Sequence, residues 1–334
     1  MKKILLLNFI CIISFSGFSQ SEDVEKLHEN AKVFMREGDY ANASLILTRA
    51  LSQAPGNIEI AKDLAFDYYL QKQNEKALAT LKPFLENNNV DDQTYQIAGT
   101  IYRALDQQKD AEKLYKKALK SYPEDGTLYN DYGEMLWAGQ DRDAIKLWEK
   151  GIQEDPSYGG NYYNACKYYV LANDNIWSLL YGEIFINIES FTSRTAEIKN
   201  ILLEEYKKLF VSQNLLAESK NKNPFEVAFL TSMNKQNSIV LNGLNAETLT
   251  MIRTRFILDW EQTYANKFPF ALFDQQEQYL QEGIFSAYNQ WIFGATQNLT
   301  AYQSWISTHP EEYAAFNKFQ QGRLFRVPKG QYYH

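Results

Sequence analysis

The stretch 110–125, DAEKLYKKALKSYPED, alternates small and bulky apolar residues along one face of an expected helix. Ala111 and Ala118 are small, Tyr115 between them is large, and Pro123 follows five residues after Ala118. Because proline lacks the N–H group that continues a helix, Pro123 helps to end this one. Small residues let a neighbouring helix come close, and a bulky residue fills the gap to the next helix. The stretch therefore predicts the second helix of a tightly packed pair.

The same spacing recurs along the first half of the chain at a period of 34 residues, shortened by one in the last case. The matching positions are Ala43, Leu47, Ala50 and Pro55, then Ala77, Leu81 and Phe84, and finally Ala144, Trp148, Gly151 and Pro156. An earlier set in each unit comprises Leu27, Ala31 and Phe34, then Leu64, Ala65 and Tyr68, then Ala98, Gly99 and Tyr102, and finally Tyr132, Gly133 and Leu136. Because Phe84 replaces a small residue, the second unit is expected to pack or end differently.

This pattern resembles the tetratricopeptide repeat, a unit of two antiparallel helices that stacks into a solenoid. The resemblance covers residues 24–158 and implies four units, at 24–57, 58–91, 92–125 and 126–158. Residues 159–212 are predicted to hold a degenerate fifth repeat and capping helices, since Ser178 stands where alanine is expected. The last of these helices is expected over 196–212, with Ser193 or Thr195 as its N-cap. The fold class is therefore all-α.

Residues 213–334 are predicted to form a separate α-helical domain rich in aromatic residues. The polar stretch 217–224, AESKNKNP, marks the boundary. Beyond it, residues 224–334 hold 21 aromatic residues in 111 positions. Apolar spacing predicts helices around 249–264, 280–292, 302–306 and 311–319. Asn245 is expected to cap the first of these helices, and Gly283 is expected to lie within the second at some cost in stability. His309-Pro310 is expected to break the third helix, and the tail after the fourth is expected to be extended.

The first twenty residues, 1–20, are predicted to be a secretory signal peptide. A basic start and an apolar run over 4–15 are followed by small residues and a cleavage site near Gln20. The run is too short to span a bilayer, and the residues before Cys11 lack the pattern of a lipoprotein signal. The ending FSGFSQ, 15–20, resembles signal peptides of Bacteroidota, which implies a periplasmic or secreted protein.

Charge and cysteine content exclude some classes of partner and cross-link. Cleavage would leave 32 basic and 41 acidic residues, a net charge of −9. An acidic chain without a basic run is a poor candidate for binding nucleic acid. Cys166 would be the only cysteine, so no intrachain disulfide is expected.

The inventory of chemical groups favours a protein without catalytic, metal or cofactor sites. The histidines, His28, His309 and His334, are too scattered for a zinc motif. Cys166 occupies a position where the repeat requires a small residue, so we expect a buried packing role. No enzyme activity is predicted.

Three further features have local explanations. Glu183 and Glu189 diverge on a helix, which favours solvation or capping over a carboxylate pair. Arg255 and Asp259 are spaced as an ordinary helical ion pair. The dipeptide at 159–160, Gly-Gly, is expected to be a flexible turn.

The resemblance also implies a binding groove, because the first helix of each repeat lines the concave face of the solenoid. The family's groove positions map onto Phe66, Tyr69, Gln96, Thr100, Arg103, Asn130, Glu134, Trp137, Tyr163 and Lys167. This mixed aromatic and polar lining suits a peptide or a partner helix. The leading function is therefore a periplasmic scaffold or adaptor that binds another protein, with Tyr69 and Trp137 as exposed anchors.

The alternative is a glycan-binding or hydrolytic C-terminal domain that the repeats dock. Trp260, Trp291 and Trp305 could stack on sugar rings. Aromatic residues at helical spacing more often fill a core, and that interpretation is favoured here.

Overall fold

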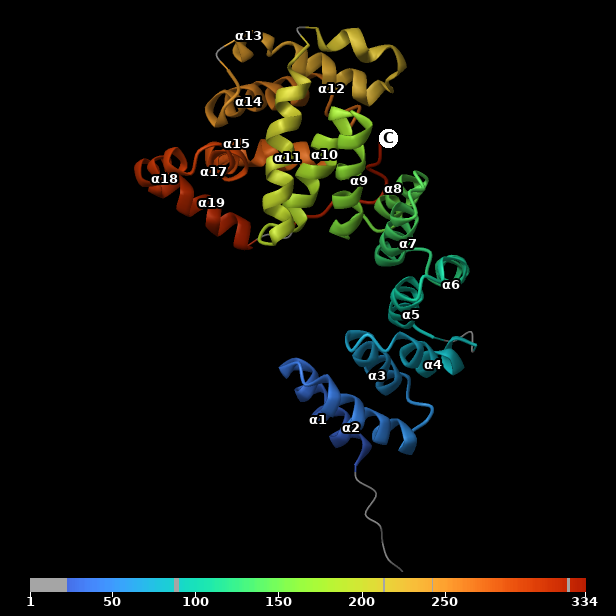
Figure 1. Cartoon of the computed structure of the whole chain (residues 1–334). Coiled ribbons are helices and arrows are strands. Elements are labelled where there is room, and N and C mark those ends of the chain that lie inside the picture. The colour runs from blue at the N-terminus through green and yellow to red at the C-terminus, as the bar shows by residue number, and fades with distance from the viewer. Residues whose placement is uncertain (1–22, 87–89, 213, 242, 323–324) are drawn as a thin grey trace, which may run out of the picture. The chain divides into compact units, whose positions relative to one another are not determined.

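The computed structural model describes residues 23–86, 90–212, 214–241, 243–322 and 325–334, and within these ranges it holds helices and no strands. The predicted signal peptide lies outside the described residues. The chain divides into two compact units, one ending at Val90 and one running from Asp91 to His334. Figure 1 labels the helices in chain order. None of the described helices combines the length and the apolar character needed to cross a bilayer.

The first unit consists of two helical pairs, as the repeat pattern predicts. They are α1 (Val24–Glu37) with α2 (Tyr40–Gln53), and α3 (Ile58–Leu70) with α4 (Asn74–Leu85). The fully buried repeat residues include Ala31, Ala43, Leu47, Ala77 and Leu81. The bulky Phe34, Tyr68 and Phe84 are partly buried. Helix α4 contains a proline and ends without the closing proline of its neighbours.

The second unit begins with further helical pairs of the same kind. They are α5 (Asp92–Ala104) with α6 (Gln108–Ser121), α7 (Gly126–Ala138) with α8 (Ala144–Glu154), and α9 (Gly159–Ala172) with α10 (Asn175–Ile188). Helix α11 (Ser193–Leu209) follows and packs against α10. The first helices α5, α7 and α9 contact one another in sequence, so they line one face. The predicted all-α repeat architecture is confirmed.

The alternation of small and bulky residues works through direct contact between a ring and a glycine. A Cβ atom on Gly99 would lie 2.8 Å from Cε1 of Tyr115, and one on Gly133 would lie 2.7 Å from Cδ1 of Trp148. Tyr115 also stacks on Tyr132 of the next pair, with ring centroids 5.6 Å apart. The Tyr115 ring therefore packs against the partner helix within its own pair and against the first helix of the next pair, as the opening stretch predicts.

Two local predictions around the fifth pair are wrong. Gly159 and Gly160 are buried in the first turn of α9 instead of forming a flexible turn. The side chains of Tyr158 and Asn130 pack against Gly160 and leave no space for a Cβ atom there. Helix α11 begins earlier than expected, and its N-cap is Thr192 in a capping box with Thr195.

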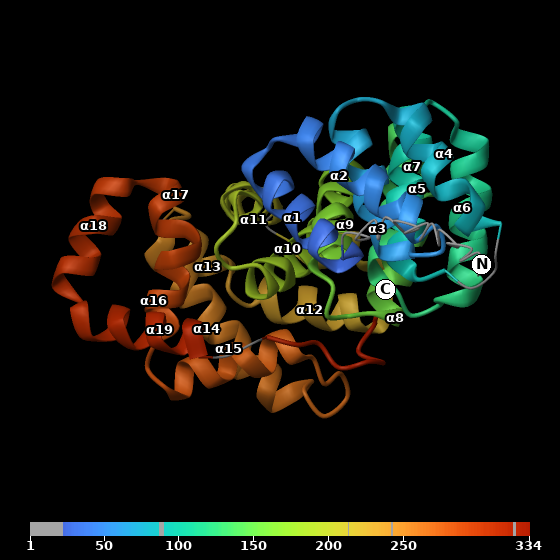
Figure 2. The same ribbon diagram turned by 90° about the horizontal axis from the view of Figure 1, so that it is seen from below.

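The C-terminal region continues with helices of mixed length. They are η1 (Leu215–Asn221), α12 (Pro224–Asn234), α13 (Asn237–Val240), α14 (Ala246–Thr263), α15 (Ala271–Gln281), α16 (Phe285–Asn289), η2 (Gln290–Gly294), α17 (Ala295–Gln297), α18 (Leu299–Thr308) and α19 (Pro310–Gly322). Helices α18 and α19 lie beside each other at one end of this region (Figures 1 and 2). The segment η2 is a π-helical turn within an otherwise α-helical run.

The helix predictions for this region are confirmed except at Gly283. Asn245 caps α14, and Pro310 opens α19 after the break at His309. The expected single helix over 280–292 is interrupted because Gly283 adopts a left-handed conformation with φ of 70°. Glycine therefore ends α15 here rather than being tolerated within it.

Aromatic residues fill the core of the C-terminal region. Phe225, Phe256, Trp260 and Phe273 are each at most 2% exposed. The rings of Trp260 and Phe273 meet edge to face, with centroids 4.8 Å apart. The interpretation that these aromatic residues form a core is confirmed for Trp260 and for Trp291, which is 9% exposed.

A buried ion pair joins the repeat helices to the C-terminal helices. Glu183 on α10 is 3% exposed and Arg253 on α14 is 1% exposed, and their side chains bind each other. Glu183 also accepts hydrogen bonds from Gln276 at 2.7 Å and from the hydroxyl of Tyr288 at 2.8 Å. The prediction that Glu183 is solvated or caps a helix is therefore wrong, because its partners come from distant helices.

The expected ion pair between Arg255 and Asp259 is also wrong. Arg255 is exposed. Asp259 instead accepts hydrogen bonds from Lys235 and from Ser232, each at 2.6 Å.

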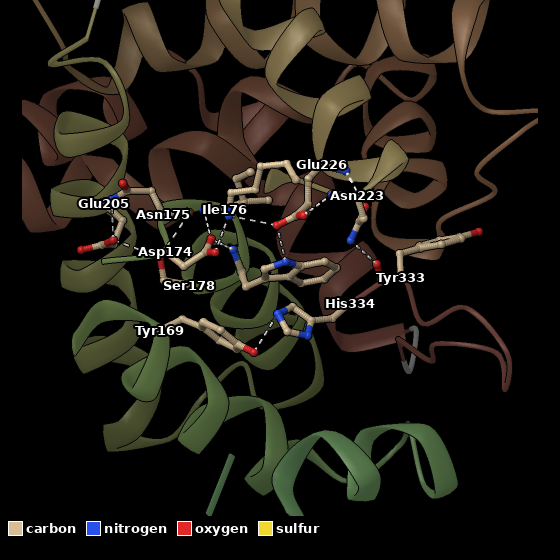
Figure 3. A network of polar contacts seen from close by, with 12 residues as sticks. Tyr169, Asp174, Asn175, Ile176, Ser178, Glu205, Asn223, Glu226, Tyr333 and His334 are labelled. Carbon is tan, nitrogen blue, oxygen red and sulfur yellow. Dashed lines mark hydrogen bonds and ion pairs between the residues drawn. The ribbon is translucent and has the colours of Figure 1, made fainter. Parts of the chain in front are cut away.

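The C-terminal tail adds a second connection between the repeats and the C-terminal region (Figure 3). His334 packs on Trp177 with ring centroids 4.9 Å apart and hydrogen-bonds the hydroxyl of Tyr169 at 2.9 Å. The ring of Tyr333 stacks on Phe225 at 4.6 Å, and its carbonyl accepts a hydrogen bond from Asn223 at 2.7 Å. The non-helical tail is thus part of the packed structure.

We predict that Gly99→Ala destabilises the protein by about 1–2 kcal/mol. Alanine favours a helix by up to about 1 kcal/mol over glycine, but the new Cβ would overlap the Tyr115 ring, which is fully buried and cannot move away. Urea titration measures the change. Lys113→Ala, whose side chain is 78% exposed, is the control and is expected to stay within about 0.5 kcal/mol. An unchanged or raised midpoint for Gly99→Ala would refute this packing account.

We predict that Arg253→Met costs about 3–5 kcal/mol, because it leaves the Glu183 carboxylate buried without its cation. The double variant Arg253→Met with Glu183→Gln is expected to recover about 2 kcal/mol or more, since no buried charge then remains. The exposed neighbour Arg255→Met serves as the control. Equal losses for the single and double variants in urea titration would mean that the pair's charges do not matter.

Candidate functional site

The predicted groove residues fall in both compact units. Phe66 and Tyr69 lie on α3, where their rings stack with centroids 6.1 Å apart. Phe66 is 40% exposed and Tyr69 is half-buried. The remaining predicted residues, which lie on α5, α7 and α9, all belong to the unit that starts at Asp91.

A ladder of polar side chains crosses the first helices of the second unit. Arg103 on α5 lies 3.5 Å from the carboxylate of Glu134 on α7. The amide of Asn130 donates to Glu134 at 3.2 Å, and Asn164 on α9 donates to the amide oxygen of Asn130 at 2.8 Å. The structure thus brings together Arg103, Asn130 and Glu134, three of the predicted residues, through side chains from successive repeats.

Asp131 lies next to this ladder, and its pKa is raised to about 6. Burial is the main cause, because it disfavours the charged carboxylate. The nearby Glu134 carboxylate raises the pKa further, while the hydrogen bond from Asn130 and the charge of Arg103 lower it. The ladder therefore sits beside a carboxyl group that changes its charge near pH 6.

A second polar cluster surrounds the two predicted residues of α9. Tyr163 donates to Glu197 of α11 at 2.5 Å, and Lys167 binds the same carboxylate at 2.8 Å. The ammonium group of Lys167 and the guanidinium of Arg194 lie 4.8 Å and 5.0 Å from the centre of the Tyr163 ring. These contacts hold Tyr163 and Lys167 in defined positions at the end of the repeat array.

An apolar pocket opens beside Lys167. It has a volume of about 290 Å³ and is lined by Trp137, Trp148, Asn164, Lys167, Tyr168, Val170, Leu171 and Ile201. The ring of Trp137 is 38% exposed and contacts the rings of Trp148 and Tyr168, with centroids 6.0 Å and 5.7 Å away. Leu171 is 69% exposed. Trp137 and Lys167, predicted separately, therefore line one pocket.

The other two predicted residues take less part in the arrangement. Gln96 donates to Asp125 at 3.4 Å, and Thr100 is half-buried on α5. Neither lines the pocket beside Trp137.

Sequence reasoning missed several residues of this site. Asn164 lies 34 residues after Asn130, so the repeat period could have identified it. Glu197 and Ile201 belong to α11, which follows the recognised repeats, and no repeat position could have pointed to them. Their role depends on how α11 packs against α9.

The described residues offer little for covalent or metal chemistry. Within the described ranges, no cluster of three or more His, Cys, Asp or Glu side chains is placed to hold a metal ion. Cys166 is completely buried, and burial raises the pKa of its thiol. A buried neutral thiol is a poor nucleophile, so the packing role predicted for Cys166 is confirmed.

Comparison with known families identifies the repeated unit. Residues 34–98 match a family model described as tetratricopeptide repeat. The human and mouse proteins called tetratricopeptide repeat protein 21B are each 29% identical over 126 residues, which is 37% of this chain. The match spans only 9% of the length of these relatives.

Solved structures with a similar arrangement include two bacterial repeat proteins. A tetratricopeptide repeat protein from Parabacteroides merdae ATCC 43184 is 15% identical and has a TM-score of 0.45, covering 77% of this chain and 97% of its own. A thermophilic TPR protein from Thermus thermophilus is 14% identical with a TM-score of 0.45, covering 55% of this chain and all of its own.

We predict that Asp131→Asn raises stability at neutral pH by about 1–2 kcal/mol. Because the folded-state pKa of Asp131 is raised to about 6, above the ordinary value of about 3.9, the native carboxyl binds its proton more tightly than the unfolded one. Its contribution to stability is full below pH ~4 and is lost as the pH rises through ~6. Asparagine stays neutral throughout, so the variant should lose less stability over this range.

Urea titrations at pH 4.5 and 7.5 check this prediction. Asp110→Asn, whose side chain is 54% exposed, is the control. If wild type and Asp131→Asn lose the same stability between these two pH values, Asp131 does not titrate as described.

Proposed function

We propose that this chain, which carries tetratricopeptide repeats, is a non-enzymatic scaffold that binds a peptide or a partner helix along the first helices of its repeats. The observation that supports this proposal is the pocket beside Trp137 in the unit that starts at Asp91. It combines a half-exposed indole ring with a polar ladder from neighbouring repeats. That combination suits a ligand with one apolar side chain and an extended polar backbone.

The pocket provides an anchor point for an apolar side chain. Its volume of about 290 Å³ is near the lower end of the range of small-molecule pockets, about 300–1,000 Å³. Trp137, Tyr168 and Leu171 present ring and aliphatic surface to it. Burying an apolar group of a partner there would remove that surface from water, and tryptophan and tyrosine are frequent hot spots in interfaces.

The polar ladder provides the recognition of a backbone. Asn130 and Asn164 carry amide groups that can both donate and accept, as a peptide backbone does. Arg103 and Lys167 are paired with Glu134 and Glu197, so the charges along this face are balanced. We therefore expect a ligand without a strong net charge in the segment that contacts the ladder, rather than a terminal carboxylate held by free cations.

We predict that selection of a random dodecapeptide display library against the purified chain enriches sequences that contain Trp, Phe or Leu. A synthetic copy of an enriched peptide should bind with a Kd in the micromolar range or tighter. Trp137→Ala should weaken that binding by about 30-fold, or about 2 kcal/mol, because the apolar anchor loses its main contact. Fluorescence anisotropy measures the affinity, and thermal unfolding of the same samples reports the folded fraction.

Two further variants separate binding from folding. Leu171→Ser changes the pocket at a side chain that is 69% exposed, so it should weaken peptide binding while leaving the fold intact. Val211→Ala alters an apolar residue that is 82% exposed and does not line the pocket, so it should change nothing. Failure to enrich any peptide, or unchanged affinity in both pocket variants, would contradict the proposal.

We also propose that the protein acts in the periplasm or outside the cell. Support comes from the basic start, the apolar run over 4–15 and the small residues before Gln20. The intact mass of the protein recovered from the cell envelope fraction tests this, since retention of residues 1–19 would contradict cleavage.

A further inference from the structure

A polar pocket lies in the C-terminal region, away from the residues that form the proposed peptide groove. Its volume is about 390 Å³, and it is lined by Asn245, Ala246, Glu247, Gln290, Gly294, Gln297, Asn298, Ala301, Tyr302 and Trp305. Five of these ten residues are Asn, Gln or Glu, and two are aromatic. The size lies within the range of small-molecule sites, about 300–1,000 Å³.

The wall of the pocket is formed where a π-helical turn meets the starts of two α-helices. Gln290 and Gly294 belong to η2, and π-helical turns in proteins often occur at functional sites. Asn245 is the N-cap of α14, and Asn298 is the N-cap of α18. Gln297 joins these elements, because it accepts a hydrogen bond from the N–H of Ala246 at 3.0 Å.

Gln290 is the residue that points to a ligand. Its side chain is 94% buried, given its exposed fraction of 6%, and it lines the pocket. No hydrogen-bond partner for its amide group exists among the residues that the structure describes. Its amide atoms are not fully shielded from solvent, so the amide faces the open space of the pocket. Amides on residues this deeply buried normally have a hydrogen-bond partner. A bound molecule in the pocket would supply that partner.

Gly294 makes room for this amide and for a ring. A Cβ atom there would overlap the side-chain oxygen of Gln290 and would lie 2.9 Å from Cδ2 of Tyr302. The absence of a side chain at this position therefore lets Gln290 and Tyr302 approach the same part of the pocket. Trp305 also lines the pocket, and its ring stacks on that of His309 with centroids 4.6 Å apart.

The lining determines the chemical class of the ligand. Glu247 is the one charged residue among the lining side chains, so an anion would be repelled. Backbone N–H groups at both helix starts are already bound, since Asn245 accepts from Thr248 and Asn298 accepts from Ala301. The remaining amide groups can donate and accept at once, as vicinal hydroxyl groups do. An aromatic ring beside them matches the apolar C–H face of a sugar.

We propose that this pocket binds a neutral saccharide, with Gln290 and Glu247 hydrogen-bonding its hydroxyl groups and Trp305 packing against its ring. The site is independent of the proposed peptide groove, because the two pockets share no lining residue. Of the three tryptophans considered from the sequence, Trp260 and Trp291 are buried in the core, and Trp305 alone lines this pocket.

Isothermal titration calorimetry of the full chain with four neutral probes tests this inference: maltohexaose, cellohexaose, xylohexaose and mannohexaose. At least one should bind with a Kd of about 1 mM or tighter. Gln290→Leu and Trp305→Ala should each weaken that binding at least about 10-fold, because one removes the buried amide and the other removes the ring. Glu247→Gln, at an exposed position, should weaken it about 3-fold or more and keeps the test valid if Gln290→Leu does not fold.

The control is Leu299→Ala, which changes a residue on the same helix that is 58% exposed and does not line the pocket. It should bind the saccharide like wild type. Hexagalacturonate and a neutral Gly-Ser hexapeptide serve as comparison probes and should not bind at this pocket. The inference is overturned if none of the four saccharides binds at 5 mM, if only a comparison probe binds, or if the three pocket variants retain full affinity.

Discussion

The structure of the second unit depends on the buried ion pair between Glu183 and Arg253. The carboxylate enters from α10, and the guanidinium enters from α14 among the rings of Tyr206, Phe285 and Tyr288. Removing two charges from water is costly, and the cost is offset only when both are paired and hydrogen-bonded. This requirement restricts how the C-terminal helices can pack on the repeats, because a shift of either helix would leave a buried charge without its partner.

The constraint explains why the repeats from Asp91 onward and the C-terminal helices form one compact unit. The last repeat helices bury large rings on the side that faces α12 and α14, and Trp177 donates to Glu226 at 3.0 Å. The tail then packs over Tyr169 and Trp177 (Figure 3). Instead of ending in an exposed hydrophobic face, the last repeats share one hydrophobic core with the C-terminal helices.

Two surfaces with different chemistry result from this arrangement. The face formed by α5, α7, α9 and α11 presents an exposed indole and the ladder of polar side chains, which suits a peptide. The pocket at η2 presents amide groups and a carboxylate, which suits hydroxyl groups. The two pockets share no lining residue, so the proposed peptide and the proposed saccharide would contact different side chains of the same compact unit.

The repeat helices could be predicted from the sequence because their determinants are local and recur. The pairing of Gly99 with Tyr115, or of Gly133 with Trp148, appears as a small residue and a bulky residue at a fixed spacing. The candidate groove residues came from the resemblance to the repeat family, and the repeat period could have added Asn164 to them. The sequence alone also determined the aromatic composition of the C-terminal region, the cap at Asn245 and the helix start at Pro310.

The contacts that only the tertiary structure decided join residues that lie far apart along the chain. Glu183 and Arg253 are separated by 70 residues, and Tyr169 and His334 by 165, so no local pattern relates them. The π-helical turn at Gln290–Gly294 also has no periodic signature, and its pocket forms only where α14 and α18 begin beside it. Periodicity reports which face of a helix is buried, whereas the identity of the partner across that face depends on how distant helices pack.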